Sequence, residues 1–252
     1  MNKILPVIGL FLLFTHPVFA DYQSAYSDYT FAYSQYRTSY NDYQVAKSTY
    51  LTYHTLVSQN EAINKLRAIL QARDQVMLVY YNLLQEKLNA TPGVTDSAKN
   101  TFGKVKASEI TWLAGHQKKV SAAASLEDLN QAASDFENHF PQMAAETKQT
   151  IGVVFAGKES TLKSQVDSFI TNLTTKLTEI RQTGENTTFA DRGQINVKNK
   201  LDLYQQKLTE ANSLFSHPDN GLFEGQQKFA EANQYLREAA SFLTEIIKSI
   251  TG

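Results

Sequence analysis

The 252-residue sequence contains no cysteine. Without cysteine the protein has no disulfide bond, no catalytic thiolate, no cysteine-ligated metal and no lipoprotein-type anchor. Glycine and proline, the residues that interrupt helices, are also scarce, with 11 and 5 copies respectively. Alanine, leucine, glutamine, lysine and glutamate are abundant, and together these frequencies favour helix over sheet.

The sequence also lacks an excess of charge of either sign, because its formal net charge is −1. Proteins that bind nucleic acids usually carry a basic excess or a basic stripe, and this sequence has neither. Apart from the first twenty residues, no apolar run is long enough to span a membrane. We therefore expect neither nucleic acid nor a membrane span among the partners of the mature chain.

Residues 1–20 have the layout of a secretory signal peptide. One positive charge, at Lys3, precedes an almost continuously apolar stretch, and the segment ends in the small residue Ala20. We expect cleavage between Ala20 and Asp21. The alternative is an uncleaved membrane anchor, for which the stretch is short and interrupted by prolines. The mature protein is expected to be secreted, or to lie at the cell surface or in the periplasm.

Nine of the thirteen tyrosines lie between Asp21 and Leu56. Eight of them follow alternating steps of four and three residues, a pattern in which Lys47 takes one place: Tyr22, Tyr26, Tyr29, Tyr33, Tyr36, Tyr40, Tyr43 and Tyr50. A repeat of 3.5 residues keeps one seam of a helix facing a partner in a left-handed coiled coil. A strand would need a period of two. The spacing therefore predicts a helix with a tyrosine seam.

This helix is expected to be very long. Apolar residues continue every seven positions after the tyrosines, and neither proline nor glycine occurs within residues 21–90. The pattern predicts one helix over 21–90, ended by Thr91-Pro92-Gly93. A capping box between Ser58 and Glu61 is the alternative, and it would divide the helix in two.

Residues 95–252 carry further helical seams and no strand pattern. The second helix is expected to start at Thr95 or Asp96, Ser125 is expected to cap the next one, and Pro141 is expected to kink or divide it. The predicted seams of the last two helices are Val197, Leu201, Tyr204, Leu208, Ala211 and Phe215, then Phe229, Ala232, Leu236, Ala239, Leu243, Ile246 and Ile250. The sequence thus predicts an all-α, elongated helical bundle with coiled-coil-like hairpins. We expect 95–252 to pack on the C-terminal half of the first helix.

Three features carry a resemblance to a group of bacterial proteins. They are the tyrosine-rich opening, the stretch Ala72-Arg73-Asp74-Gln75-Val76-Met77, and the Glu-Ala-Asn rhythm of the last two helices. With these the chain resembles uncharacterised exported helical surface proteins of candidate-phylum bacteria. The resemblance implies a setting at the cell surface, and it carries over no activity and no functional residue.

No motif supports an enzyme, a cofactor or a metal site. Residues 152–159, GVVFAGKE, differ from the phosphate-binding loop at their last position, where Glu159 replaces the hydroxyl residue that would hold magnesium. Asp135 and His139 could share a helix face and bind a metal weakly, but a surface pair is the favoured interpretation. His116 is expected to lie in or beside the core. We therefore expect no enzymatic activity and no cofactor.

The tyrosine seam is the most unusual feature of the sequence. Tyrosine suits a surface that binds a partner yet stays soluble, because its ring is apolar and its tip is polar. The seam is therefore a candidate interface for self-assembly or for another surface protein. A second possibility is a module that binds cell-envelope glycan or peptide. The alternative to both is that the tyrosines pack inside the protein's own bundle.

Overall fold

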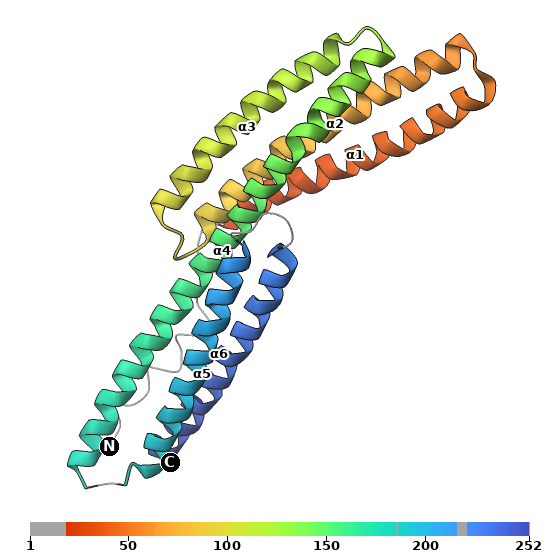
Figure 1. Cartoon of the computed structure of the whole chain (residues 1–252). Helices are drawn as coiled ribbons and strands as arrows, with labels where there is room; N and C mark the ends of the chain where they lie inside the picture. The colour runs from red at the N-terminus through yellow and green to blue at the C-terminus, as the bar shows by residue number, and fades with distance from the viewer. Residues whose placement is uncertain (1–18, 185, 216–220, 252) are drawn as a thin grey trace. The chain divides into compact units, whose positions relative to one another are not determined.

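The computed structural model describes residues 19–184, 186–215 and 221–251. Within these ranges the chain forms six α-helices and no strand: α1 (Phe19–Tyr53), α2 (Leu56–Ala90), α3 (Asp96–Ala122), α4 (Leu126–Gln182), α5 (Thr188–Phe215) and α6 (Gly221–Thr251) (Figure 1). The prediction of an all-α helical bundle is confirmed. Residues 1–18 of the expected signal peptide lie outside the described residues.

The chain divides into two compact units. Of the described residues, unit 1 contains those up to Ala90 together with Gly103–Glu137, and unit 2 contains Thr91–Phe102 and those from Asn138 onward. Residues 95–252 were predicted to form one bundle, and this prediction is wrong. The reason is that α4 begins among the helices of unit 1 and continues as a helix of unit 2.

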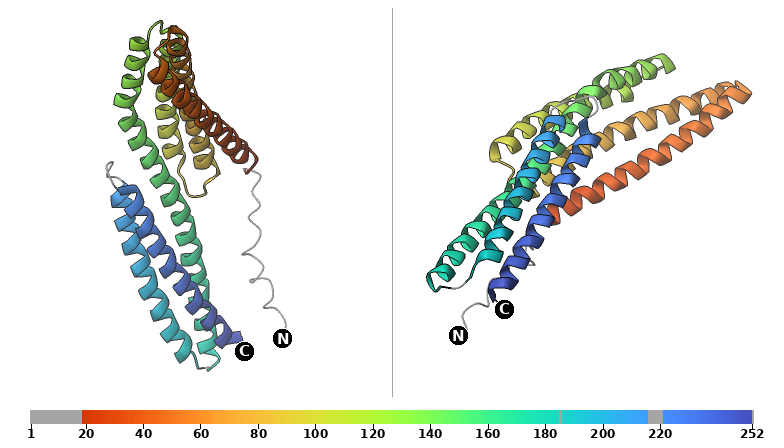
Figure 2. Two further views of the ribbon diagram at one scale, coloured as in Figure 1. Left: turned by 90° about the vertical axis from the view of Figure 1, so that its right-hand side faces the viewer. Right: turned by 60° about the horizontal axis from the view of Figure 1, so that its bottom comes forward.

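In unit 1, α1 and α2 run antiparallel as a helical hairpin (Figures 1 and 2). The Lys87 ammonium lies 4.4 Å from the centre of the Tyr22 ring. Seven residues further along α1 and seven back along α2, the ring centroids of Tyr29 and Tyr80 are 5.4 Å apart. The equal steps show that a heptad repeat on each helix sets the register of the hairpin.

The single helix predicted over 21–90 is wrong, because the chain turns back at His54 and Thr55. His54 has a φ of 50°, and Thr55 forms a reciprocal capping box with Ser58. The Ser58 amide donates to Thr55 Oγ1 at 3.1 Å and the Thr55 amide donates to Ser58 Oγ at 3.2 Å. The alternative prediction paired Ser58 with Glu61 and made Ser58 the N-cap. In the structure the N-cap is Thr55, and Ser58 is the residue three positions later that bonds back to it. Neither a proline nor a glycine marks this turn.

The core of unit 1 joins α2 and α3 to the start of α4. It contains Leu66, Ile69, Leu70, Val120, Ala123, Leu129 and Ala132, with Tyr36 and Tyr43 of α1 packed against it. The helix starts behave as predicted. The Ala98 amide donates to Thr95 Oγ1 and the Asp128 amide donates to Ser125 Oγ, so both hydroxyls are N-caps.

In unit 2, α5 and α6 lie side by side and antiparallel, packed with the second part of α4 (Figure 2). The predicted seams face this core, with buried side chains at Val197, Tyr204, Leu208, Ala211, Phe215, Phe229, Ala232, Ala239, Leu243 and Ile246. Leu201 and Leu236 are half-buried, and the side chain of Ile250 lies outside the described residues. Pro141 does not divide α4, which is continuous through it.

Candidate functional site

The sequence of α1 places two kinds of residue on the side that packs against α2. A tyrosine recurs every seven residues, and a small residue follows each of the first four after three positions. The small residues are Ala25, Ala32, Ser39 and Ala46, of which the three alanines are buried and Ser39 is half-buried. Alternation of a large and a small side chain lets the hairpin close along its length.

The tyrosines of this repeat, which we name the inner tyrosines, are Tyr22, Tyr29, Tyr36, Tyr43 and Tyr50. All five are half-buried. Burial raises the pKa of Tyr29, with a further contribution from the neighbouring Tyr33 and Tyr26, so its hydroxyl remains neutral. The inner tyrosines therefore belong to the packing of unit 1.

The remaining seam residues, the outer tyrosines, are Tyr26, Tyr33 and Tyr40. Each is 45% exposed. Each also contacts an inner ring, with centroid distances of 6.4 Å for Tyr22–Tyr26, 6.1 Å for Tyr29–Tyr33 and 6.5 Å for Tyr36–Tyr40. These contacts hold the outer rings along one flank of α1, where a large part of each ring remains open to solvent.

The surface beside the outer tyrosines is polar but almost uncharged. Residues three and four positions from an outer tyrosine are its neighbours on the helix, and the exposed row reached in this way is Gln23, Thr30, Arg37 and Gln44. The next row around the helix is Ser27, Ser34, Asn41 and Ser48, also exposed. Arg37 supplies the one charge in these rows. Tyrosine surrounded by serine and asparagine is typical of binding surfaces, because it combines rigid aromatic area with adaptable hydrogen bonding.

The eight predicted site residues thus lie on one helix but have two environments. From the sequence alone they form a single seam, because all eight tyrosines follow the same alternating spacing of four and three residues. The signal that separates them is the small residue three positions after each inner tyrosine. Since α2 has the same length as α1, 35 residues, it can pack along the whole row of inner tyrosines.

A buried polar pair lies elsewhere in unit 1. His116 Nδ1 is 2.7 Å from Asp74 Oδ2, and His116 Nε2 is 2.8 Å from the carbonyl oxygen of Ala132. Trp112 stacks on the imidazole with ring centroids 5.1 Å apart. Both side chains of the pair are almost completely buried, as predicted for His116. Asp74, on α2, was not anticipated as its partner.

The charge state of this pair follows from its contacts. A carbonyl oxygen only accepts, so Nε2 must carry a proton, and the Nδ1–Asp74 hydrogen bond contains another. Burial disfavours the imidazolium, but the hydrogen bonds to Asp74 and Ala132 outweigh burial and raise the pKa of His116. Burial also raises the pKa of Asp74. Since Nε2 is engaged with Ala132, it cannot serve as the base of a catalytic triad.

Arg73 adjoins the buried pair and completes a charged cluster. Its guanidinium carbon lies 3.6 Å from the centre of the Phe136 ring, which is a cation–π contact. Burial lowers the pKa of Arg73. Arg73 Nε and Nη2, and Asp74 Oδ1, have no hydrogen-bond partner among the described residues. This polar cluster specifies how α2, α3 and α4 meet rather than forming an open site.

The resemblance of residues 152–159 to a phosphate-binding loop has a structural explanation. The segment lies within α4, where no loop exists to surround a phosphate. A Cβ on Gly152 would lie 2.8 Å from Phe215 Cβ, and one on Gly157 would lie 2.5 Å from Val94 Cγ2. Glu159 is buried and accepts a hydrogen bond from the Tyr204 hydroxyl. The two glycines therefore permit close packing in unit 2.

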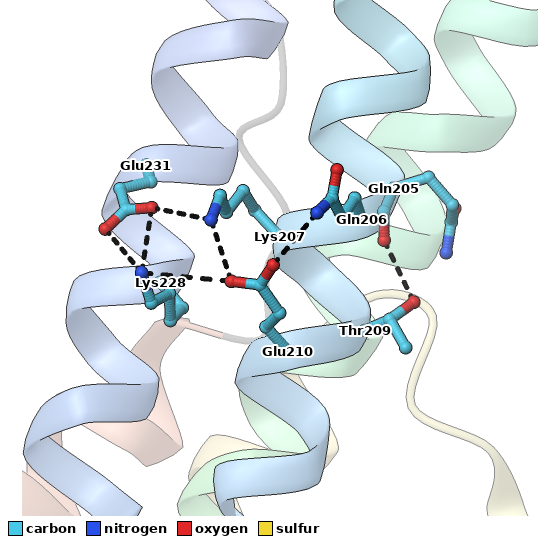
Figure 3. Close-up of polar contacts among 7 residues, drawn as sticks. All are labelled: Gln205, Gln206, Lys207, Thr209, Glu210, Lys228 and Glu231. Carbon is cyan, nitrogen blue, oxygen red and sulfur yellow. Dashed lines mark hydrogen bonds and ion pairs between the residues drawn. The ribbon is translucent and has the colours of Figure 1, made fainter.

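A surface cluster of four charged side chains joins α5 to α6 (Figure 3). Lys207 Nζ lies 2.8 Å from Glu210 and 3.3 Å from Glu231, and Lys228 Nζ lies 3.0 Å from Glu231 and 3.8 Å from Glu210. Two cations and two anions neutralise one another, and all four side chains are partly exposed. The network links two helices and leaves no unbalanced charge to attract a ligand.

Within the described parts of the chain, no group of three or more His, Cys, Asp or Glu side chains could hold a metal ion. Asp135 is hydrogen-bonded to Lys119 and to Gln131. In the same described ranges, no helix is both long enough and apolar enough to cross a membrane. Comparison with protein-family models, with curated proteins and with solved structures finds no match for this chain.

Proposed function

We propose that the chain is an exported, non-enzymatic interaction protein that associates with a second copy of itself through the outer tyrosines. The observation that carries this proposal is the row formed by Tyr26, Tyr33 and Tyr40, each 45% exposed on one flank of α1, beside the row of inner tyrosines that packs against α2. An aligned row of exposed aromatic rings is typical of an interface.

A second copy of α1 matches the row in spacing. The three rings recur every seven residues, or roughly every 10 Å along the helix at 1.5 Å per residue. A two-fold axis beside Tyr33 places Tyr26 opposite Tyr40 of the second copy, so the row is complementary to itself. In this antiparallel arrangement Arg37 lies level with position 29 of the second copy, whereas a parallel arrangement would bring the two Arg37 side chains to the same level. We therefore propose antiparallel α1–α1 pairing.

The second candidate function is the binding of a neutral cell-envelope glycan or peptide. The observation that favours it is the composition of the rows beside the outer tyrosines, in which hydroxyl and amide side chains surround the rings and Arg37 is the one charge. Such side chains can hydrogen-bond to a neutral ligand without desolvating a charge.

Light scattering over a concentration series tests the proposal. We expect the molar mass of the parent chain to rise towards that of a dimer as its concentration is raised. The triple variant Tyr26→Ser, Tyr33→Ser, Tyr40→Ser should remain a monomer with unchanged helicity. Phe31→Ser and Val45→Ser form the matched control, because both residues are exposed apolar side chains of α1 outside the row. A monomeric parent chain that is retained on cell-envelope glycan would favour the second candidate.

A further inference from the structure

The turn between α1 and α2 presents an apolar tip. Four large side chains within seven residues are mostly exposed: Leu51 (57%), Tyr53 (69%), Leu56 (70%) and Val57 (80%). The heptad pattern that follows the tyrosines in the sequence begins at Leu56 and predicts it in the seam of a continuous helix. It is exposed because the hairpin ends there and no described helix of unit 1 covers it. None of these four residues belongs to the outer tyrosines.

The tip is also free of charge. Between Lys47 and Glu61 the sequence contains no Asp, Glu, Lys or Arg. Behind it, Lys65 of α2 forms ion pairs with Asp42 at 3.0 Å and with Glu61 at 3.8 Å. The hairpin thus has an uncharged apolar end followed by a collar in which charges of opposite sign are paired.

The backbone holds the tip in a fixed conformation. His54 adopts a φ of 50°, its amide donates to the Tyr50 carbonyl at 2.8 Å, and its ring packs edge-on against Tyr50 at 5.6 Å. The capping box of Thr55 and Ser58 starts α2 immediately afterwards. A residue with positive φ that is not glycine is uncommon. Because the turn is ordered in advance, the apolar side chains stay outward and less entropy is lost when they are buried.

We propose that this tip inserts into the interfacial region of a lipid bilayer. A stable protein interface buries roughly 800 Å² on each partner, with 20–30 residues a side, and four side chains on a convex turn do not provide such a surface. A fluid bilayer closes around a convex tip of any size. Tyr53, which is 69% exposed, is suited to the boundary between headgroups and acyl chains, where a ring with a polar tip is favoured.

The charged collar limits how deeply the tip inserts and determines which lipids the tip prefers. Asp42, Glu61 and Lys65 remain in water, since their desolvation is unfavourable. With the exposed Lys47 at the same end of the hairpin, two cations balance these two carboxylates, so insertion depends on apolar contact and not on anionic lipid. Phosphatidylcholine, which has no net charge, is therefore a sufficient target.

The absence of cysteine allows a direct test with the full-length chain. A single environment-sensitive dye is attached to a Val57→Cys variant and, as the control, to a Thr38→Cys variant at an exposed position in the middle of α1. Each protein is mixed with phosphatidylcholine vesicles. A dye at one position reports insertion at that position, so binding through residues 1–20 does not imitate the signal. We expect a blue shift and a several-fold rise in emission for Val57→Cys only, with quenching by lipids brominated in their acyl chains.

We expect the partition of the labelled Val57→Cys chain into the vesicles to weaken at least about tenfold when Leu51→Ser and Leu56→Ser are added. Each substitution removes an apolar side chain that is buried on insertion. Four results would overturn the proposal. The first is the absence of any change at position 57, and the second is an equal change at position 38. The third is a change that needs anionic vesicles. The fourth is a change that appears without vesicles as the protein concentration rises.

Discussion

Tyr29 and Tyr33 stack on one another with ring centroids 6.1 Å apart, yet only Tyr29 reaches Tyr80 on the opposing helix. Tyr29 is half-buried, whereas Tyr33 is 45% exposed. One helical turn therefore separates a tyrosine that holds the hairpin together from one that is open to a partner. The same relationship recurs along α1 and divides the eight tyrosines into two structural classes, inner and outer.

The first prediction separates these classes by stability. Tyr29→Ser with Tyr36→Ser should lower the free energy of unfolding of unit 1 by about 1–2 kcal/mol per residue, roughly half the effect expected for fully buried aromatic rings. Substitution of the outer tyrosines by serine should change it by less than about 0.5 kcal/mol each, as for surface positions. Urea unfolding followed by circular dichroism gives both values. Equal losses for the two sets would show that the division is incorrect.

A second prediction concerns the small residues of the hairpin. Ala32 is buried between inner tyrosines, so Ala32→Leu should overpack the contact with α2 and destabilise unit 1 by about 1–3 kcal/mol. Ser34→Leu, on the exposed side of α1, is the matched control and should be nearly neutral. Thermal unfolding of both variants provides the measurement. A neutral Ala32→Leu would show that α1 and α2 do not approach closely at this position.

The third prediction is a pH dependence that originates at His116. Its folded pKa is raised above the unfolded value of about 6.5. The stabilisation from its protonated form is therefore complete below about pH 6.5 and is lost as the pH rises through the folded pKa. The pKa of Asp74 is also raised in the folded state, so Asp74 likewise lowers the free energy of unfolding as the pH rises, but over a lower pH range. We expect the free energy of unfolding of unit 1 to fall from pH 6 towards alkaline pH.

Trp112 is the only tryptophan of the chain and stacks on His116, so its fluorescence reports the unfolding of unit 1. Asp74→Asn should flatten the pH dependence, because a neutral histidine can then accept at Nδ1 and still donate to Ala132. His116→Ala should cost about 3–5 kcal/mol at neutral pH, since it leaves a buried carboxylate without its partner. A parent chain whose stability rises between pH 6 and pH 8 would contradict this account of the pair.

The fourth prediction uses two glycines in helices. Gly157→Ala brings a Cβ to 2.5 Å from Val94 Cγ2 and 2.8 Å from the Val94 amide nitrogen, so the backbone must move. The resulting overpacking, about 1–3 kcal/mol, should exceed the helix-propensity gain of about 1 kcal/mol. A Cβ on Gly115 meets nothing within 4 Å, and Gly115→Ala should therefore stabilise the protein. Thermal unfolding distinguishes the two signs. Stabilisation by both substitutions would contradict the close packing of Gly157.

The sequence predicts the helical class, the seams of α5 and α6 and the N-caps at Thr95 and Ser125, because these follow from periodicity and local hydrogen bonds. It does not predict the turn at His54, which contains neither glycine nor proline and closes through the antiparallel pairing of α1 with α2. It likewise does not predict that Asp74 meets His116, since that contact depends on the packing of α2 against α3. Long-range pairing decides both features.

Crosslinking in the cysteine-free chain tests the proposed self-association most directly. Antiparallel pairing about Tyr33 predicts that a short bis-maleimide links two copies of Tyr33→Cys efficiently, links Tyr26→Cys to Tyr40→Cys when the two are mixed, and links neither of these to itself. Thr38→Cys, on a different face of α1, should give no crosslinked dimer at the same concentration. Equal crosslinking at positions 33 and 38, or none at position 33 under conditions where light scattering detects a dimer, would contradict the proposed interface.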